Sequence, residues 1–218
     1  MNSPLIQLLV LAAIAVFLIL RLKNVLGTRE GFEKPPLPTP AAKRSGPAFE
    51  VIQGGPDLDI TDHFDEGTPQ ARALAEMKRI EPSFNVTDFL AGGRGAYEMI
   101  VMGYERGELD GIKDFLSEEI YESFVDGVAA REDQGLKIEA SFIGVREMSL
   151  ENVTLDPETK EAEMTLRFVA ELTQAVRNSE GEIIEGSVTD AKKQKDTWVF
   201  ARVMGADDPN WFLVSTDG

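Results

Sequence analysis

The period of the hydrophobic pattern changes once along this chain, near Gln134-Gly135, and this change decides the fold class. Between residues 68 and 134, apolar residues recur every three to four positions, which is typical of amphipathic helices. After residue 135 the apolar residues alternate with polar ones, most clearly over 161–172, which is typical of strands with one buried face. Turns are predicted at Asp156-Pro157 and Ser179-Glu180-Gly181. Because the predicted helices come first and the strands follow at hairpin spacing, the sequence predicts an α+β domain in which helices pack on one face of a curved antiparallel sheet.

Capping signals place the ends of the predicted elements. Thr68-Pro69 is typical of an N-cap followed by the first helical residue, and Ser117 is typical of another N-cap. The predicted helices cover 68–80, 85–107, 109–116 and a stretch from 117 onward, and the predicted strands cover 137–142, 161–172, 197–203 and 211–214.

An apolar run near the N-terminus predicts a transmembrane anchor. Between Leu5 and Leu20 only Gln7 is polar, and a helix over this run reaches roughly 24 Å against a hydrocarbon core of ~30 Å. A cleaved signal peptide is the first alternative, but it lacks preceding basic residues and a small-residue cleavage site. A buried core helix is the second, but the segment that follows offers it no packing partner. The predicted anchor residues are Leu5, Leu8, Leu9, Val10, Ile14, Val16, Phe17, Leu18, Ile19 and Leu20.

Basic residues on one flank predict the orientation of the anchor. Arg21, Lys23 and Arg29 follow the apolar run, so the positive-inside rule keeps the body on the cytoplasmic side of a bacterial inner membrane, or in a mitochondrial matrix. Residues 28–67 are rich in Pro and Gly and lack periodicity, which predicts a flexible linker. The expected organisation is an anchor with its basic flank at 1–27, a linker at 28–67 and the α+β domain at 68–218.

Charge and composition exclude several classes of function. Residues 1–48 carry six basic and two acidic side chains, which leaves 16 basic and 36 acidic side chains for the rest. Such an acidic body argues against nucleic acid as a partner, because phosphate binding needs a basic surface. The chain has no Cys and one His, which excludes thiolate metal sites, cysteine nucleophiles and His-rich metal centres. We expect no cofactor and no metal.

The sequence contains no recognisable catalytic constellation. The Gly92-Gly93-Arg94-Gly95 run lies inside a helical pattern instead of following a strand, and no Ser stands in a Gly-x-Ser-x-Gly elbow. His63 lies among Asp62, Asp65 and Glu66, where a weak divalent-cation site competes with the simpler interpretation of solvated loop charges. We therefore expect a protein that is not an enzyme.

Several motifs together suggest a family. They are Glu81-Pro82-Ser83-Phe84, Leu116-Ser117-Glu118-Glu119-Ile120-Tyr121, Asp196-Thr197-Trp198-Val199-Phe200-Ala201-Arg202 and Asp208-Pro209-Asn210-Trp211-Phe212-Leu213-Val214. With them, the chain from about Thr68 to Thr216 resembles the C-terminal domain of the Tim44 family, the membrane tether of the mitochondrial import motor. It is similar, more closely, to the alphaproteobacterial TimA-type proteins.

The resemblance implies a cone-shaped fold similar to nuclear transport factor two, with an apolar pocket between sheet and helices. It implies core positions for Phe84, Phe89, Tyr97, Leu116, Tyr121 and Phe124, and sheet positions for Trp198, Phe200 and Trp211. It also implies that the first domain helix contacts the membrane or a partner. The residues expected to do so are Arg72, Leu74, Met77, Lys78 and Arg79.

Two functions remain open from the sequence. The first is an inner-membrane-anchored adaptor whose domain binds the lipid bilayer surface and protein partners, such as translocase or chaperone components. The alternative is a binder of lipid or another small apolar ligand, with Met99, Met102, Met148 and Met164 lining an unfilled cavity. A third hypothesis, an isomerase-like or hydratase-like enzyme, requires a buried acid–base pair in that cavity.

Overall fold

Capping side chains set the helix boundaries in the computed structural model, which describes residues 56–217. The helical elements are α2 (Leu58–Thr61), α3 (Pro69–Ile80), α4 (Val86–Arg106), the 3-10 turns η1 (Leu109–Gly111) and η2 (Lys113–Phe115), and α5 (Glu118–Asp133). Thr68, Asn85 and Ser117 each accept a hydrogen bond from a backbone N–H three residues later, as N-caps do. The caps predicted at Thr68 and Ser117 are confirmed, whereas the predicted helix at 109–116 is two separate 3-10 turns.

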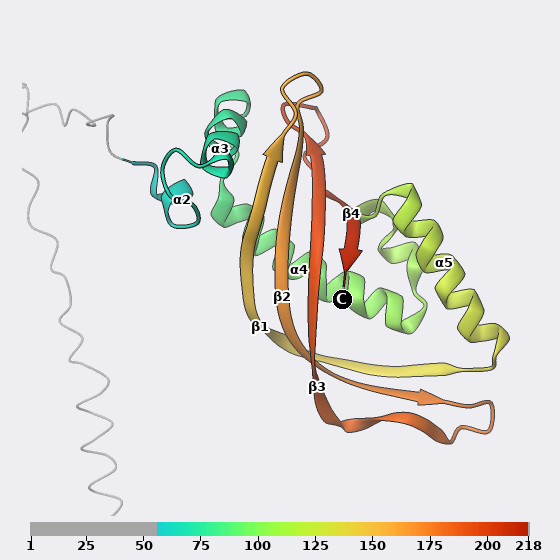
Figure 1. Cartoon of the computed structure of the whole chain (residues 1–218). Coiled ribbons are helices and arrows are strands. Elements are labelled where there is room, and N and C mark those ends of the chain that lie inside the picture. The colour runs from blue at the N-terminus through green and yellow to red at the C-terminus, as the bar shows by residue number, and fades with distance from the viewer. Residues whose placement is uncertain (1–55, 218) are drawn as a thin grey trace, which may run out of the picture. The chain divides into compact units, whose positions relative to one another are not determined.

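Four antiparallel strands form one sheet in the order β1-β2-β3-β4 (Figure 1). They are β1 (Lys137–Leu155), β2 (Glu161–Arg177), β3 (Ile183–Val203) and β4 (Phe212–Asp217). The predicted alternation is confirmed in β2, where Ala162, Met164 and Leu166 are completely buried. β4 is short and pairs with β3 only between Thr197 and Ala201. β1 and β3 are much longer than the sequence analysis predicted.

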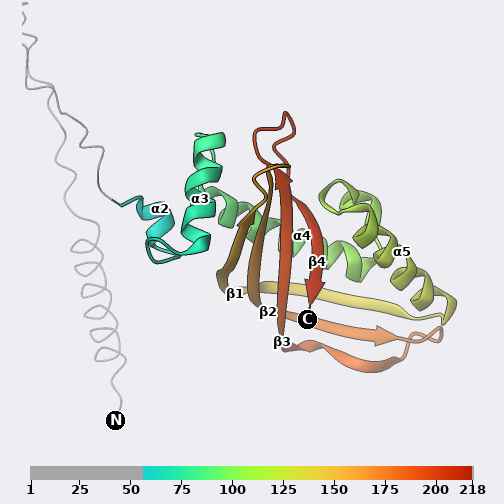
Figure 2. The ribbon, with the colours of Figure 1, turned by 45° about the horizontal axis from the view of Figure 1, so that its top comes forward.

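The long strands β1, β2 and β3 bend near their middles. The first part of β1, the last part of β2 and the first part of β3, called the outer halves below, run beneath α5 (Figures 1 and 2). Pairing shifts register at the bend, between Phe142 and Gly144 of β1 and between Leu172 and Gln174 of β2. Gly186 of β3 has a φ of +74°, and a Cβ there would lie 2.1 Å from the carbonyl oxygen of Gln174. Only glycine fits this irregularity in the β2–β3 pairing.

Aromatic side chains fill the space between α4 and the sheet. The ring of Tyr97 in α4 stacks on Phe168 of β2, with centroids 4.2 Å apart, and lies 4.7 Å from Trp198 of β3. All three side chains are buried. The cluster continues toward β4, where the rings of Phe89 and Trp211 are 4.8 Å apart. These contacts form the centre of the hydrophobic core.

Most residues that the resemblance assigned to the core or the sheet lie there, with three exceptions. Phe84, Phe89, Tyr97 and Leu116 are buried, and Trp198 and Phe200 belong to β3. Tyr121 and Phe124 are only partly buried, because α5 packs at the edge of the domain, against β4 and η1. Trp211 precedes β4 instead of lying in it.

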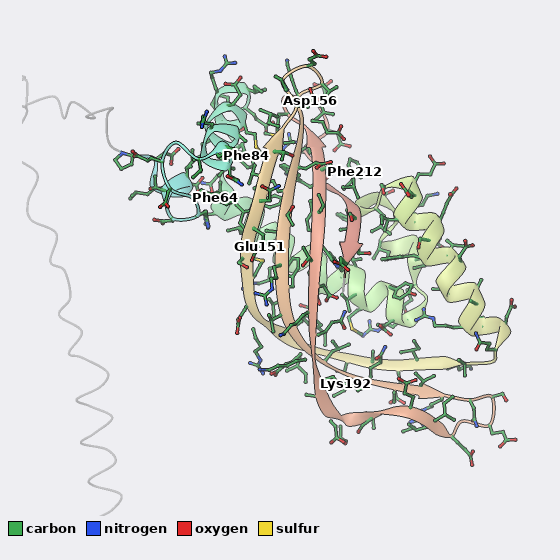
Figure 3. The ribbon with its side chains drawn as sticks, viewed as in Figure 1. Phe64, Phe84, Glu151, Asp156, Lys192 and Phe212 are labelled. Carbon is green, nitrogen blue, oxygen red and sulfur yellow. The ribbon has the colours of Figure 1, made fainter. Side chains whose placement is uncertain are left out.

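The folded part of the chain begins before residue 68. Residues Asp57–Phe64, which the sequence analysis placed in the linker, carry α2 and pack on α3 and α4, with Ile60 buried. Figure 3 shows Phe64 next to α2. Among residues 56–217, no helix combines the length and apolar character needed to cross a membrane. The predicted anchor, Leu5 to Leu20, and the basic flank of Arg21, Lys23 and Arg29 lie outside the described residues.

Candidate functional site

Helix α3, the expected membrane-contacting or partner-contacting helix, turns its apolar side inward. Leu74 and Met77 have no exposed surface and belong to the hydrophobic core, and α3 packs against β1. These two residues therefore do not form a contact surface in this structure, which corrects the expectation. An amphipathic stripe serves a protein core as well as it serves a membrane, so the pattern alone did not distinguish the two.

The three basic residues expected on the same surface all have partners inside the domain. The guanidinium of Arg72 donates to the carbonyl oxygen of Gly67 at 2.8 Å. Arg79 forms an exposed ion pair with Glu76, one turn earlier in α3. Lys78 reaches back to α2, which makes it part of a larger cluster.

That cluster centres on Asp59 of α2. One carboxylate oxygen accepts a hydrogen bond from the backbone N–H of Val86 at 2.8 Å, and the other accepts from the N–H of Thr87 at 3.0 Å. The ammonium of Lys78 lies 2.8 Å from Asp59 and 2.7 Å from Asp57. Burial alone would raise the pKa of Asp59, but Lys78 and the two amides outweigh it and hold the pKa well below its ordinary value. The carboxylate thus stays charged while it joins α2, α3 and the start of α4.

An open groove of about 820 Å³ lies along the C-terminal half of α4. Its apolar lining comes from Met99 and Met102 of α4, Leu109 and Ile112 around η1, and Phe142 of β1. Charged side chains also line it, three of them acidic and one basic: Glu98, Glu108, Asp110 and Arg106. The groove therefore combines apolar contact area with a net negative charge, and it is the candidate binding site.

The four methionines expected in one pocket are divided between two environments. Met99 and Met102 line the groove. Met164 of β2 is completely buried in the core, and Met148 of β1 packs against that core while partly exposed. The structure therefore does not gather the four side chains around one cavity, because aromatic rings fill the interior between α4 and β2.

A polar network connects the end of α4 to α5 and to the outer half of the sheet. The carboxylate of Glu105 accepts a hydrogen bond from the side-chain amide of Gln174 at 2.9 Å and lies 3.9 Å from the guanidinium of Arg131. Arg131 also donates to the carbonyl oxygen of Tyr104 at 2.7 Å and lies over its ring. This network positions α5 next to the end of α4 that lines the groove. The sequence analysis missed it, because nothing local relates Gln174 to Glu105.

His63 and its acidic neighbours are the candidate divalent-cation site that the sequence suggests. Among residues 56–217, no three His, Asp or Glu side chains are gathered closely enough to hold a metal ion. Asp62, Asp65 and Glu66 therefore do not form a cluster with His63 that would act as a ligand set in this structure.

Comparison with known proteins identifies the domain. Residues 70–218 match the model of the Tim44-like domain. The chain belongs to the Tim44-like domain family. The mitochondrial import inner membrane translocase subunit TIM44-1 of Arabidopsis thaliana is 21% identical over 145 residues, which are 66% of this chain and 30% of that protein. The chain thus matches under a third of its relative's length.

Comparison with solved structures gives a weak match. The intermembrane space region of the chloroplast protein ARC6 is 12% identical to this chain, with a TM-score of 0.36, and the match covers 57% of this chain and 94% of that one.

Proposed function

We propose that this protein is a membrane-anchored adaptor whose Tim44-like domain binds a protein partner in protein translocation or envelope assembly. The observation that carries the proposal is the contrast between a filled interior and an open groove. A carrier of lipid or another small apolar ligand needs an enclosed apolar cavity. Here Tyr97, Phe168 and Trp198 fill the space between the middle of α4 and the sheet, whereas the groove beside the C-terminal half of α4 is open and partly apolar.

The chemistry of the groove indicates what a partner would present. Met99 and Met102 are flexible and adapt to side chains of different shapes. The acidic residues Glu98, Glu108 and Asp110 favour a segment that carries basic side chains next to its apolar ones. The acidic body of the chain would steer the same kind of segment toward the groove before contact is made.

The proposed role is binding and not catalysis. Tyr97 and Asp196 form a buried hydrogen-bonded pair in the core, but neither lines the groove in which a partner or substrate would bind. Residues 1–27 would hold the domain at a bacterial inner membrane, on the cytoplasmic side. Residues 28–55 would act as a linker that lets the domain extend away from the membrane surface.

Photo-crosslinking in intact membranes tests the proposal. A photoreactive amino acid at Glu98 or Glu108, in the full chain, should give a discrete protein adduct that mass spectrometry identifies. The matched control is Glu163, which is exposed on the opposite face of β2. Double substitution with Glu108→Lys and Asp110→Lys should reduce the protein adduct at Glu98 about tenfold. Adducts to lipid alone at both groove positions would contradict the adaptor and favour an apolar ligand.

A further inference from the structure

The segment Asp57–Phe64, called the clasp below, is attached to the domain mainly by charged contacts. Ile60 is its buried apolar residue and Phe64 is half buried. The polar contacts are more numerous, since Asp59 binds Val86, Thr87 and Lys78 while Asp57 binds the same lysine. A segment held in this way has a lower free energy of opening than the sheet, which is held by a continuous core.

The clasp supplies the acceptor for two amides at the start of α4, those of Val86 and Thr87, but both neighbouring helices also have N-caps of their own. Helix α4 has a separate N-cap, because the side chain of Asn85 accepts from the N–H of Asp88 at 3.0 Å. Helix α3 is likewise capped by Thr68 and is held to β1 by Leu74 and Met77. Loss of the Asp59 contacts would therefore leave both helices capped and packed.

We propose that the clasp opens as a unit while α3, α4 and the sheet stay folded, and that it regulates both the reach of the domain and the exposure of α3. Opening removes both acidic partners from Lys78. It also uncovers Ala71, which is buried and lines a hollow of about 260 Å³ together with Ile60. The closed clasp thus masks a basic and apolar surface of α3. Opening also releases eight residues, and in extended form they add roughly 25 Å to the linker.

Thiol labelling tests this proposal, because the chain contains no cysteine. Ile60→Cys reports opening of the clasp, and Ala162→Cys, at a completely buried position of β2, reports global unfolding. In the full chain in mild detergent, we expect the thiol at position 60 to react at least tenfold faster than the one at position 162. Asp59→Asn weakens the closed clasp and should raise the rate at position 60 a further tenfold, while the thiol at position 60 stays at least tenfold faster than the one at position 162.

The matched control is Asp62→Asn, which removes the same charge from an exposed residue of the clasp and should leave both rates unchanged. Equal rates at positions 60 and 162 would overturn the proposal, since they would mean that the clasp opens only with the whole domain. An unchanged rate at position 60 upon Asp59→Asn would overturn it as well, because it would mean that the Asp59 contacts do not hold the clasp closed.

Hydrogen exchange of the unmodified chain provides a second test if Ile60→Cys disturbs the fold. We expect amides in 58–64 to exchange at least tenfold faster than those in 97–102 of α4. The same protection in both segments would exclude independent opening of the clasp.

Discussion

Tyr97 of α4 donates a hydrogen bond from its phenol to the carboxylate of Asp196 in β3, and both side chains are buried. The second carboxylate oxygen of Asp196 accepts from the side chain of Gln194 at 3.1 Å. Burial and the neighbouring carboxylate raise the pKa of Tyr97 far above its ordinary value, so the phenol keeps its proton and remains a donor. The bond fixes the central helix to the sheet in one register.

The first prediction concerns this bond. Tyr97→Phe keeps the ring but leaves a buried carboxylate oxygen without its donor, and we expect a loss of about 2 kcal/mol in the free energy of unfolding. Urea unfolding followed by the fluorescence of Trp198 and Trp211 measures it. Tyr121→Phe is the control, because that hydroxyl has no hydrogen-bond partner among residues 56–217. A loss below about 0.5 kcal/mol for Tyr97→Phe would contradict the proposed contribution of the bond.

The second prediction concerns Arg202 and Glu81. The guanidinium of Arg202 is buried and donates to both carboxylate oxygens of Glu81, at 2.8 and 3.0 Å. Glu81→Gln leaves a buried cation without its counter-charge, and we expect the free energy of unfolding to fall by about 3 kcal/mol. Glu76→Gln breaks an exposed pair with Arg79 and should leave the urea midpoint unchanged within error. Equal shifts of the urea midpoint in Glu81→Gln and Glu76→Gln would contradict the expectation that the buried ion pair contributes more to stability than the exposed one.

The third prediction separates two glycines in α4. A Cβ on Gly93 would lie 2.7 Å from a methyl group of Leu166, which is completely buried and cannot move aside freely, whereas a Cβ on Gly92 would meet nothing within 4 Å. Gly93→Ala should therefore destabilise the domain by about 1 kcal/mol. Gly92→Ala should stabilise it by about 0.5–1 kcal/mol, because alanine restricts the unfolded chain and favours helix. Melting temperatures that shift in the same direction would refute this prediction.

The fourth prediction is a pH dependence at Asp59. Because the pKa of this carboxyl is lowered in the folded state, its contribution to stability is complete at neutral pH. It is lost progressively as the pH falls below the ordinary value of 3.8. Asp59→Asn should therefore lower the urea midpoint at pH 7, and the difference between variant and wild type should shrink at pH 3. A difference that stays constant across this range would show that the charge of Asp59 does not stabilise the fold.

The parts of the fold that could be predicted from the sequence are those that local chemistry determines. Thr68, Asn85 and Ser117 cap helices with their own side chains, and β2 shows its buried face directly in the alternation of its residues. Residues 143–155 of β1 were missed, because shifts in the pairing register interrupt the alternation of their side chains. The first part of β3 was missed because both of its faces are largely exposed, so its residues do not alternate.

The candidate site was less accessible to prediction. Asp59 and Ile60 stand in a segment that resembles a linker, and their packing depends on Lys78 and Val86, which are distant in sequence. The sequence carried one signal for α2: Asp57 is a good N-cap and accepts from the N–H of Asp59. For the groove, Met102 and Met164 could not be distinguished, because only the three-dimensional fold shows which of them faces a filled interior.

The shortness of β4 affects how the protein behaves when its copies are crowded together. Within the described residues, β3 has a strand on its outer edge only from Thr197 to Ala201, so its earlier part presents open backbone groups close to the exposed Ile183 and Ile184. An open edge of this kind invites self-association through strand pairing. The chain places Lys192, Lys193 and Lys195 along it, and like charges that would have to be buried side by side oppose such pairing. Charged side chains of this kind on an open strand edge disfavour edge-to-edge pairing, and this effect matters most when copies of the protein are close together.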